Sequence, residues 1–282
     1  MCQFRPPLDL VLPETVRRHA MKPDLAFLNL EGVKTVARQV GCMAWRATLA
    51  IPGVFREPGW LAGPMESALI KAMPLALVAG SAIGIVVWIH VRETLVRVAG
   101  PGAAMYLPQG LALAVVVELA PLSAGLMAAG RSGASLAAEL AAMRVSEQLD
   151  ALGALGREPS RVLVAPRMVA LMVALPLLTG VIALAALVSA DLMESLSGGL
   201  TSTRFWEEAW RVVRMRDLIP SLSKTVVFGW LVAILACHHG IHAGEGTEGV
   251  GRAATSGVVS GIVAVLVSNV ALVKLIQFCL PP

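Results

Sequence analysis

Apolar residues recur along this chain in five long stretches that carry very few charges. A helix needs about 20 predominantly apolar residues to cross the hydrocarbon core of a bilayer, so each stretch predicts a transmembrane helix. The predicted spans are residues 66–90, 106–136, 166–190, 220–243 and 253–278. The predicted fold class is therefore an all-α integral membrane protein.

Two different patterns precede the first span. Residues 1–29 mix prolines with basic residues and contain no apolar core of a cleavable signal peptide, which predicts a disordered cytoplasmic tail. From 30 to 61, apolar residues recur at helical spacing between basic ones, and Trp45 and Trp60 are suited to a membrane interface. We predict an amphipathic helix lying on the membrane surface; an ordinary helix packed on protein is the alternative.

The segment between the second and third spans is polar and helical in its spacing. Its charged and amide residues include Arg144, Glu147, Gln148 and Asp150. Its apolar residues fall on one side of a helix, at Val145, Leu149, Leu152 and Leu155. Gly156 and Pro159 follow and favour termination. This pattern predicts a short amphipathic helix over about residues 144–156.

Small residues recur four apart near the end of the second span, in two adjacent stripes. The stripes are Ala129, Gly133 and Ala137, and Gly130, Ala134 and Ala138. Small residues at this spacing let helix backbones approach closely in a membrane. We therefore predict that this face packs against other helices.

Composition agrees with a membrane protein and argues against other classes. The chain is 56% hydrophobic and 15% charged, with a mean hydropathy of +0.74. Its net charge of +4 does not indicate nucleic-acid binding, because the basic residues lie between apolar runs without interleaved aromatics. If residues 139–167 are cytoplasmic, most basic residues are cytoplasmic too, which favours a cytoplasmic N-terminus and a C-terminus on the other side.

The loop from residue 191 to 224 is too long for a simple turn. Aromatic and charged residues alternate in it at helical spacing, including Phe205, Trp206 and Trp210. This pattern predicts a short helix on the outer membrane interface. The chain shows no internal repeat of 20–50 residues, so a transporter built from two related halves is not supported.

Ionisable residues inside spans are costly and usually face protein or a water-filled cavity. Glu118 lies in the middle of the second predicted span, and Asp217 and Lys224 lie two helical turns apart at the entry to the fourth. We predict that Lys224 pairs with Glu118. A functional pair and a purely structural pair both fit the sequence.

Other chemistry is poorly supported by the sequence. His238 and His242 are one turn apart, but no third ligand is placed nearby, so no metal site is predicted. The four cysteines, at 2, 42, 237 and 279, are scattered, and no nucleophile constellation indicates an enzyme. A phosphate-binding G-x-x-x-x-G-K-[ST] loop is missing, so ATP hydrolysis would belong to another chain.

Several motifs in order resemble one family. The run ELAPLSAGLMAAGRSGASLAAELAAMRVSEQLDALGALGREPSRVLVAPR, from 118 to 167, resembles the central signature of MlaE/YrbE-type permeases, the membrane subunits of ABC transporters that move lipids with MCE-domain proteins. DLIPSLSKTVVFG at 217–229 and GEGTEGVGRAATSGVV at 244–259 continue the resemblance, which covers residues 30–282 as one permease domain. Val117 stands where many members have an arginine.

The resemblance implies a homodimeric permease of phospholipid or a related lipid in the bacterial inner membrane. It implies an N-terminal interfacial helix, five spans, and a cytoplasmic coupling helix that docks on a separate ABC ATPase, which binds ATP and Mg. The coupling residues would be Arg144, Glu147, Gln148, Asp150 and Leu152, and the lipid cavity would include Glu118, Asp217 and Lys224. An MCE-domain protein and a STAS-domain protein are further implied partners.

Two other functions remain open from the sequence. The chain is also compatible with a secondary transporter of an amphiphilic solute, for which a repeat or a chain of carboxylates would be expected. A membrane scaffold without transport is the second alternative. Stable association with an ATPase distinguishes the permease from both.

Overall fold

The structure is a computed structural model that describes residues 30–54, 59–156 and 158–279. The chain divides into two compact units, residues 1–42 and 43–282. In the first unit, the described part is the beginning of helix α2 (Leu30–Leu49). The tail predicted for residues 1–29 lies outside the described residues.

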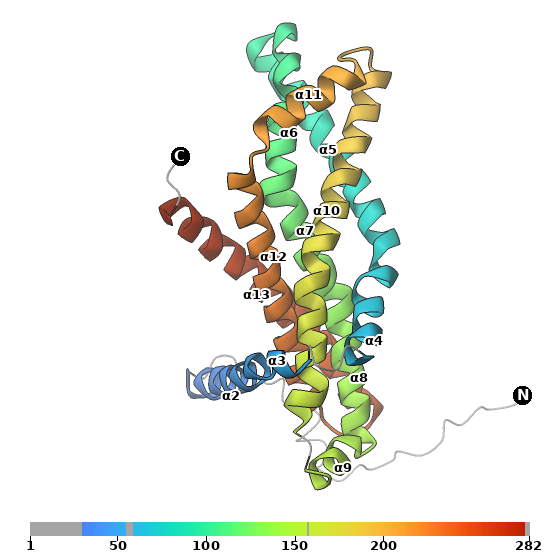
Figure 1. The fold of residues 1–282 in the computed structure, drawn as a ribbon, viewed down its shortest axis with the longest axis vertical. Helices are drawn as coiled ribbons and strands as arrows, with labels where there is room; N and C mark the ends of the chain where they lie inside the picture. The colour runs from blue at the N-terminus through green and yellow to red at the C-terminus, as the bar shows by residue number, and fades with distance from the viewer. Residues whose placement is uncertain (1–29, 55–58, 157, 280–282) are drawn as a thin grey trace, which may run out of the picture. The chain divides into compact units, whose positions relative to one another are not determined.

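Five helical segments are long and apolar enough to cross a membrane (Figure 1). They are Gly59–Ala99, Gly102–Val145, Ser160–Leu196, Met215–Ile241 and Gly246–Phe278. Each exceeds the roughly 20 residues that a bilayer requires, and each overlaps one predicted span. The predicted all-α membrane fold with five spans is confirmed.

Several spans are assembled from consecutive helical elements. The first consists of α4 (Gly59–Ala68), η2 (Ile70–Ala72) and α5 (Met73–Ala99). The second consists of η3 (Pro101–Tyr106), α6 (Leu107–Ala114), η4 (Val115–Leu119), α7 (Ala120–Ala128), η5 (Ala129–Gly133) and α8 (Ala134–Val145). The third consists of η6 (Ser160–Val164) and α10 (Ala165–Leu196), the fourth of α12 (Met215–Ile241), and the fifth of α13 (Gly246–Cys279). The shorter helices α3 (Ile51–Val54), α9 (Gln148–Ala154) and α11 (Ser202–Val212) lie outside these spans.

Two spans widen into a π-helical turn directly before an Ala-Pro pair. The turn η4 precedes Ala120 and Pro121, and η6 precedes Ala165 and Pro166. In each, the alanine N–H donates to the carbonyl oxygen five residues back. Proline has no N–H, and its ring clashes with the carbonyl four residues earlier, so the preceding turn expands. The two prolines therefore account for the π turns η4 and η6, whereas the second span widens again at η5 without a proline after it.

Glycines allow the backbones of α5 and α10 to touch. Gly80 and Gly84 are buried, and a Cβ on either would overlap a backbone carbonyl oxygen of α10, that of Ile182 or Ala186. Close approach of this kind is typical of small residues at helix interfaces in membranes. The first and third spans are thus held together by packing that tolerates no larger side chain.

The stripe of Ala129, Gly133 and Ala137 is buried against helices of the same chain. A Cβ on Gly257 of α13 would lie 3.0 Å from the Cβ of Ala137, and one on Gly261 would lie 3.2 Å from that of Ala129. This face therefore joins the second span to the fifth within one chain, so it is not the surface on which a second copy would dock.

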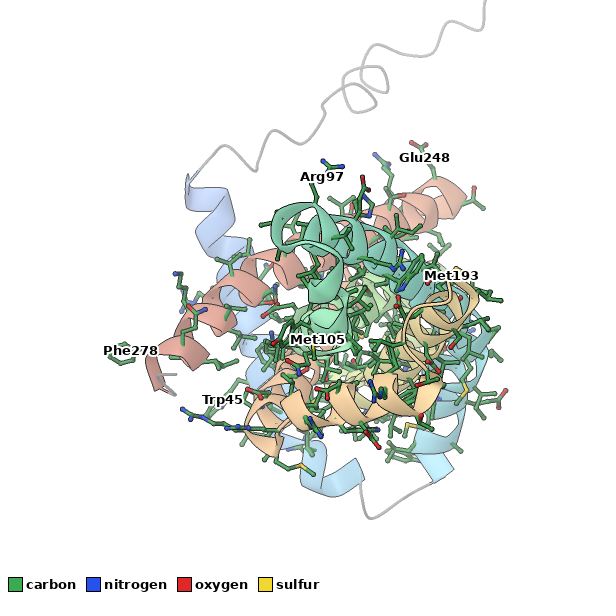
Figure 2. The ribbon with its side chains drawn as sticks, turned by 90° about the horizontal axis from the view of Figure 1, so that it is seen from above. Trp45, Arg97, Met105, Met193, Glu248 and Phe278 are labelled. Atoms are coloured by element: carbon green, nitrogen blue, oxygen red, sulfur yellow. The ribbon has the colours of Figure 1, made fainter. Side chains whose placement is uncertain are left out.

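Other apolar surfaces are exposed. In the second stripe, Gly130 is exposed, and Ala134 and Ala138 are half-buried. Figure 2 shows Phe278, at the end of α13, pointing away from the other helices, and this side chain is 86% exposed. Lipid or another protein would cover these surfaces in a membrane.

The connection between the second and third spans corrects the helix predicted over 144–156. The preceding helix α8 runs on to Val145 and includes Arg144. The chain then turns at Ser146 and Glu147, where Glu147 has a left-handed φ of 59°, and α9 covers only Gln148–Ala154. The apolar spacing runs evenly across the turn and does not reveal a break at one non-glycine residue. Of the predicted apolar face, Leu149 is buried, whereas Val145 and Leu155 are exposed.

The single interfacial helix predicted over 30–61 is also divided. Helix α2 ends at Leu49, α3 follows, residues 55–58 lie outside the described part, and α4 continues into the first span. Pro52 and Gly53 interrupt the helical pattern here, since proline removes a backbone donor and glycine disfavours helix. Trp45 and Trp60 are 69% and 41% exposed, on separate helices.

The helix predicted in the loop from 191 to 224 is present as α11. Phe205 and Ala209 are buried beneath it, and Trp210 is exposed. The indole N–H of Trp206 donates to Asp191 of α10 at 3.1 Å. This helix is thus fixed across the end of the third span, next to the start of α12.

The close contact of α5 with α10 predicts opposite effects of one substitution at two glycines. Alanine is favoured over glycine within a helix by about 1 kcal/mol. At Gly84 the new Cβ meets Ala186, and overpacking costs about 1–3 kcal/mol. Gly84→Ala should lower the thermal unfolding temperature of the purified protein, whereas Gly180→Ala, whose Cβ has no atom within 4 Å, should leave it unchanged or raise it. Equal changes of the unfolding temperature in the two variants would show that α5 and α10 do not pack closely at Gly84.

Candidate functional site

A cavity of about 880 Å³ lies between the start of α12, the end of α13 and the second span around η4. Figure 1 shows α13 diverging from α12 toward its C-terminal end, on the side where the cavity is found. Its lining residues are Leu113, Val117, Glu118, Arg211, Val212, Arg214, Arg216, Asp217, Pro220, Ser221, Lys224, Val273, Ile276 and Gln277. The cavity therefore combines apolar walls with six ionisable side chains.

An ion pair between two spans forms the inner part of this cavity. Lys224 Nζ lies 2.8 Å from Glu118 Oε1, so the predicted contact is present. The Lys224 side chain is 2% exposed and that of Glu118 is 38% exposed. Because α12 begins at Met215, Lys224 lies within the helix and not near its end, and it reaches Glu118 without bending toward the interface. The ammonium is thus enclosed by protein, while the carboxylate remains open to the cavity.

Two backbone carbonyls of the π turn are bound by side chains of α12. Ser221 Oγ donates to the Val116 oxygen at 2.6 Å, and Lys224 Nζ donates to the Val117 oxygen at 2.9 Å. Pro121 has no N–H, so it cannot donate a hydrogen bond to the carbonyl of Val117, four residues earlier, or to that of Val116, five residues earlier. Buried carbonyl oxygens need a hydrogen-bond donor. Ser221 and Lys224, which lie three residues apart on one face of α12, supply these donors.

The fifth span adds one polar side chain to the pair. Asn269 Nδ2 donates to the second carboxylate oxygen of Glu118 at 3.4 Å. The Glu118 carboxylate is therefore held between α12 and α13. Helices from three spans meet at this one side chain.

Arginines surround the outer part of the cavity. Arg211, Arg214 and Arg216 line it together with Asp217, and all three arginines are exposed. Arg211 pairs with Glu208 of α11 at 2.9 Å. In the lining itself, four cationic side chains face two carboxylates, which favours the entry of an anionic group.

The structure brings together the cavity residues that the sequence indicated and adds others. Glu118, Asp217 and Lys224 line one cavity, in which Glu118 and Lys224 form an ion pair. The three arginines and Asn269 were not predicted as cavity residues from the sequence. A cluster of basic residues between 211 and 216, just before an apolar span, and a lone amide within the fifth span were the available signals.

The residues proposed for coupling lie around the turn between α8 and α9. Arg144 and Asp150 form an ion pair at 2.8 Å across this turn, and both side chains are about half exposed or more. Glu147 and Gln148 are exposed, and Leu152 is half-buried. These residues form one polar surface, whose binding of another protein stays a prediction.

The histidines at the other end of α12 stack on one another. The ring centroids of His238 and His242 are 4.4 Å apart. Within the described residues, no group of three or more His, Cys, Asp or Glu side chains is placed to hold a metal ion.

Comparison with known proteins gives a consistent set of relatives. Residues 62–275 match the family described as Permease MlaE. A probable ABC transporter permease protein of Rickettsia typhi is 31% identical over 257 residues, which cover 89% of this chain and 98% of that protein. A probable ABC transporter permease protein of Synechocystis is 33% identical over 199 residues, covering 71% of this chain and 74% of the relative. An Arabidopsis thaliana protein named trigalactosyldiacylglycerol 1, chloroplastic, is 35% identical over 159 residues, which are 56% of this chain and 45% of that protein.

The unequal exposure of Glu118 and Lys224 predicts unequal costs when the pair is broken. Glu118→Gln leaves a buried ammonium without a counter-charge, which should cost about 3 kcal/mol or more. Lys224→Met leaves a carboxylate that the cavity can hydrate but also removes the donor to the Val117 carbonyl oxygen, so it should cost about 1–3 kcal/mol. Thermal unfolding of both variants in detergent measures the difference. The double variant should be more stable than Glu118→Gln alone, and a larger loss in Lys224→Met would contradict the assignment of the buried partner.

Proposed function

The chain belongs to the MlaE permease family, and on that premise we propose that it is the subunit of an ABC-type transporter that carries a phospholipid or a related lipid through the cavity at Glu118. As a member of this family it is a multi-pass membrane permease of ABC-transporter type and a transport subunit rather than an enzyme.

The observation that carries the proposal is the amphipathic cavity itself. A lipid has an anionic or zwitterionic head and apolar chains. The exposed arginines would bind the phosphate by charge-assisted hydrogen bonds, and the apolar walls formed by Leu113, Val273 and Ile276 would contact the chains. The open divergence of α13 gives such a molecule room to enter from the side. The name of the Arabidopsis relative, which contains that of a glycolipid, supports a lipid substrate.

We propose the assembly from the same premise. Two copies of the chain would form a homodimer through surfaces that are exposed in the single chain. A separate ABC ATPase would bind the surface around α9 and hydrolyse ATP with Mg, since the sequence has no phosphate-binding loop. An MCE-domain protein would exchange lipid with the cavity, and a STAS-domain protein would be a further partner of the complex.

The distribution of basic residues supports an orientation. With α9 on the cytoplasmic side of a bacterial inner membrane, most lysines and arginines are cytoplasmic. The cavity mouth and α11 then face the periplasm, where an MCE-domain partner would be found. The N-terminus would be cytoplasmic and the C-terminus periplasmic.

Filling the cavity should block transport without disturbing the fold. Leu113 lines the cavity and is 41% exposed, so Leu113→Trp adds volume without displacing buried atoms. In proteoliposomes that contain the whole transporter, lipid transfer should fall about tenfold or more, equivalent to about 1.4 kcal/mol of lost lipid binding. The measurement is transfer of a fluorescent phospholipid, together with mass spectrometry of the lipid that co-purifies.

Val86→Trp is the matched control, because Val86 is 52% exposed on α5 and lines no part of this cavity. Wild-type transfer in Leu113→Trp would remove the cavity from the transport route. An assembled complex that transfers no lipid in any variant would favour a scaffold, and ATP-independent transfer would favour a secondary transporter.

The ion pair between Arg144 and Asp150 allows a test of coupling that leaves the local structure intact. Exchanging the charges, as Arg144→Asp with Asp150→Arg, keeps the pair but reverses the field presented to a partner. Charges at the rim of an interface affect the binding of the partner more than the folding of the chain. Like charges placed opposite each other across an interface cost several kcal/mol of binding free energy. We expect ATPase co-purification and ATP-driven lipid transfer to fall while the unfolding temperature is unchanged. Normal coupling in the exchanged variant would locate the ATPase contact elsewhere.

A further inference from the structure

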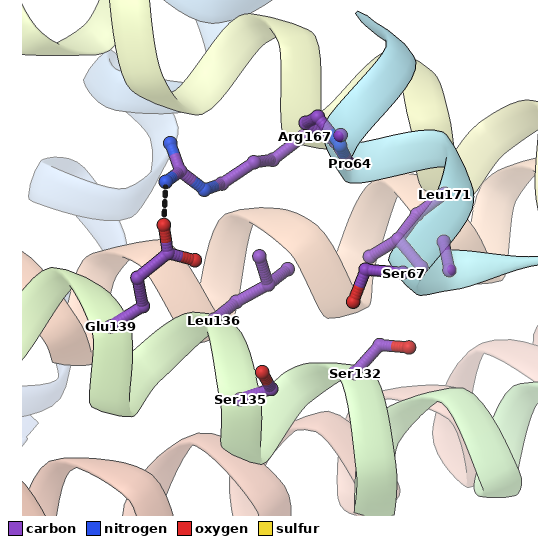
Figure 3. Close-up of a pocket in the computed structure, with 10 residues that line it drawn as sticks. Pro64, Ser67, Ser132, Ser135, Leu136, Glu139, Arg167 and Leu171 are labelled. Atoms are coloured by element: carbon purple, nitrogen blue, oxygen red, sulfur yellow. Dashed lines mark hydrogen bonds and ion pairs between the residues drawn. The ribbon is translucent and has the colours of Figure 1, made fainter. Parts of the chain in front are cut away.

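A second cavity of about 230 Å³ lies where α4, α8 and α10 meet, away from the ion pair of Glu118 (Figure 3). Its walls combine a few apolar side chains with Arg167, Glu139 and three serines, at positions 67, 132 and 135. At roughly 30 Å³ for each water, the volume corresponds to about eight waters, or to one small polar group. The cavity is therefore large enough for a ligand.

The charged residues of this cavity form one neutral pair. Arg167, whose side chain is 10% exposed, donates to Glu139 Oε1 at 2.5 Å (Figure 3). It also donates to the Leu163 carbonyl oxygen at 2.9 Å. A guanidinium has five N–H groups, so three remain beyond these two bonds. Glu139 is 49% exposed and keeps acceptor capacity. The pair presents donors and acceptors to the cavity without net charge.

The serines add three hydroxyls that the protein itself does not engage. Ser67 and Ser135 are exposed and Ser132 is half-buried, and none of the three hydroxyls has a hydrogen-bond partner among the described residues. Ser67 lies on α4, Ser132 on η5 and Ser135 on α8. Each hydroxyl can both donate and accept. A ligand in the cavity would meet polar groups on three sides.

This set of groups favours a neutral polyol over an ion. An ion of either sign would gain little net attraction here, because the charges of Arg167 and Glu139 already neutralise each other. Hydroxyl groups both donate and accept, so they can satisfy the carboxylate, the guanidinium and the serines together. The ligand chemistry that the cavity fits is a glycerol- or hexose-sized polyol.

An apolar groove begins further along the same helices and indicates where such a polyol would come from. The groove has a volume of about 710 Å³ and lies between α5 and α10, from Met73 to Ser81 and from Val181 to Leu192. Ten residues separate Leu171 in the cavity from Val181 in the groove, a rise of about 15 Å. Along the first span, Met73 of the groove follows Ser67 of the cavity by six residues, a rise of about 9 Å, so the near end of the groove is within reach of a chain whose head group occupies the cavity. Exposed Val173 and Leu177 lie between the two.

We propose that this cavity and groove together bind a lipid with a neutral polyol head group, the head between Arg167 and the serines and one chain along α5 and α10. The site is separate from the transport cavity and does not depend on the function proposed for it. A free polyol from solution offers the same head-group chemistry, and the experiment distinguishes the two sources.

The test uses the assembled transporter in phosphatidylcholine nanodiscs with a monoglucosyl diacylglycerol that carries a photoreactive diazirine on one chain. Mass spectrometry should find the label on residues 73–81 and 173–192. Ser135→Leu fills the cavity and should abolish labelling there. Ser67→Ala and Ser132→Ala should each weaken it about fivefold, the usual effect of one lost hydrogen bond. Ser135→Thr keeps the hydroxyl and should restore it.

Controls separate this site from folding and from transport. Ser256→Leu places the same substitution on an exposed position of α13 and should leave labelling unchanged. The unfolding temperature without ligand identifies any variant that is merely unstable. Leu113→Trp should leave labelling intact, so failure of the transport proposal and failure of this one give different results.

Competition identifies the ligand. Loss of labelling with methyl glucoside, accompanied by equal thermal stabilisation from methyl glucoside alone, would support the polyol chemistry with a soluble source. Labelling that methyl glucoside does not displace supports the lipid source. Equal labelling by diacylglycerol without a head group, no response to the serine substitutions, or stronger competition by phosphatidic acid would each overturn the proposal.

Discussion

Two backbone carbonyls at Val116 and Val117 set the arrangement on which the transport cavity depends. Pro121 offers them no N–H, and a bilayer offers no water, so side chains must satisfy them. Ser221 and Lys224 do so from α12. Because these two bonds fix the register of α12 against the second span, they also place the Lys224 ammonium at Glu118. An irregularity in one helix thus becomes the contact that positions a charge in another.

The cavity results from the unequal packing of the helices around this contact. Alanine and glycine residues hold α13 against α8 and η5 in its first half, where Gly257 and Gly261 are buried. Farther along, α13 carries larger side chains and diverges, so only Asn269 reaches Glu118 and the space beyond it stays open (Figure 1). Helix α11 then directs the chain back over the opening and brings arginines to it. Helix α13 is therefore closely packed in its first half and leaves the cavity open beside its second half.

The second span links this cavity to the polar surface at α9 through one continuous helical segment. From Glu118 to Arg144 the chain rises by about 39 Å at 1.5 Å per residue. The same segment is buried against α12 and α13 at Ala129 and Ala137, and Arg167 pairs with Glu139 near its end. A partner that moved α9 would therefore act on a packed element, and closely packed interfaces shift between discrete arrangements rather than deform.

The sequence by itself determined the five spans, the helix between 191 and 224, and the presence of Glu118 and Lys224 within apolar segments, because length, apolar spacing and the cost of a charge in lipid are local properties. Its motifs also indicated the family. Only the tertiary structure decided that the π turn at Pro121 binds α12, that the stripe of Ala129 and Gly133 faces the same chain, and that the helix at 144–156 breaks at Glu147. Arg211, Arg214 and Arg216 line the cavity only because α11 lies across the end of the third span. These features depend on which backbone groups lack a hydrogen-bond partner within their own helix and on which other helix packs against them. Such contacts join residues about a hundred positions apart in the chain, such as Val117 and Lys224, so local sequence patterns do not reveal them.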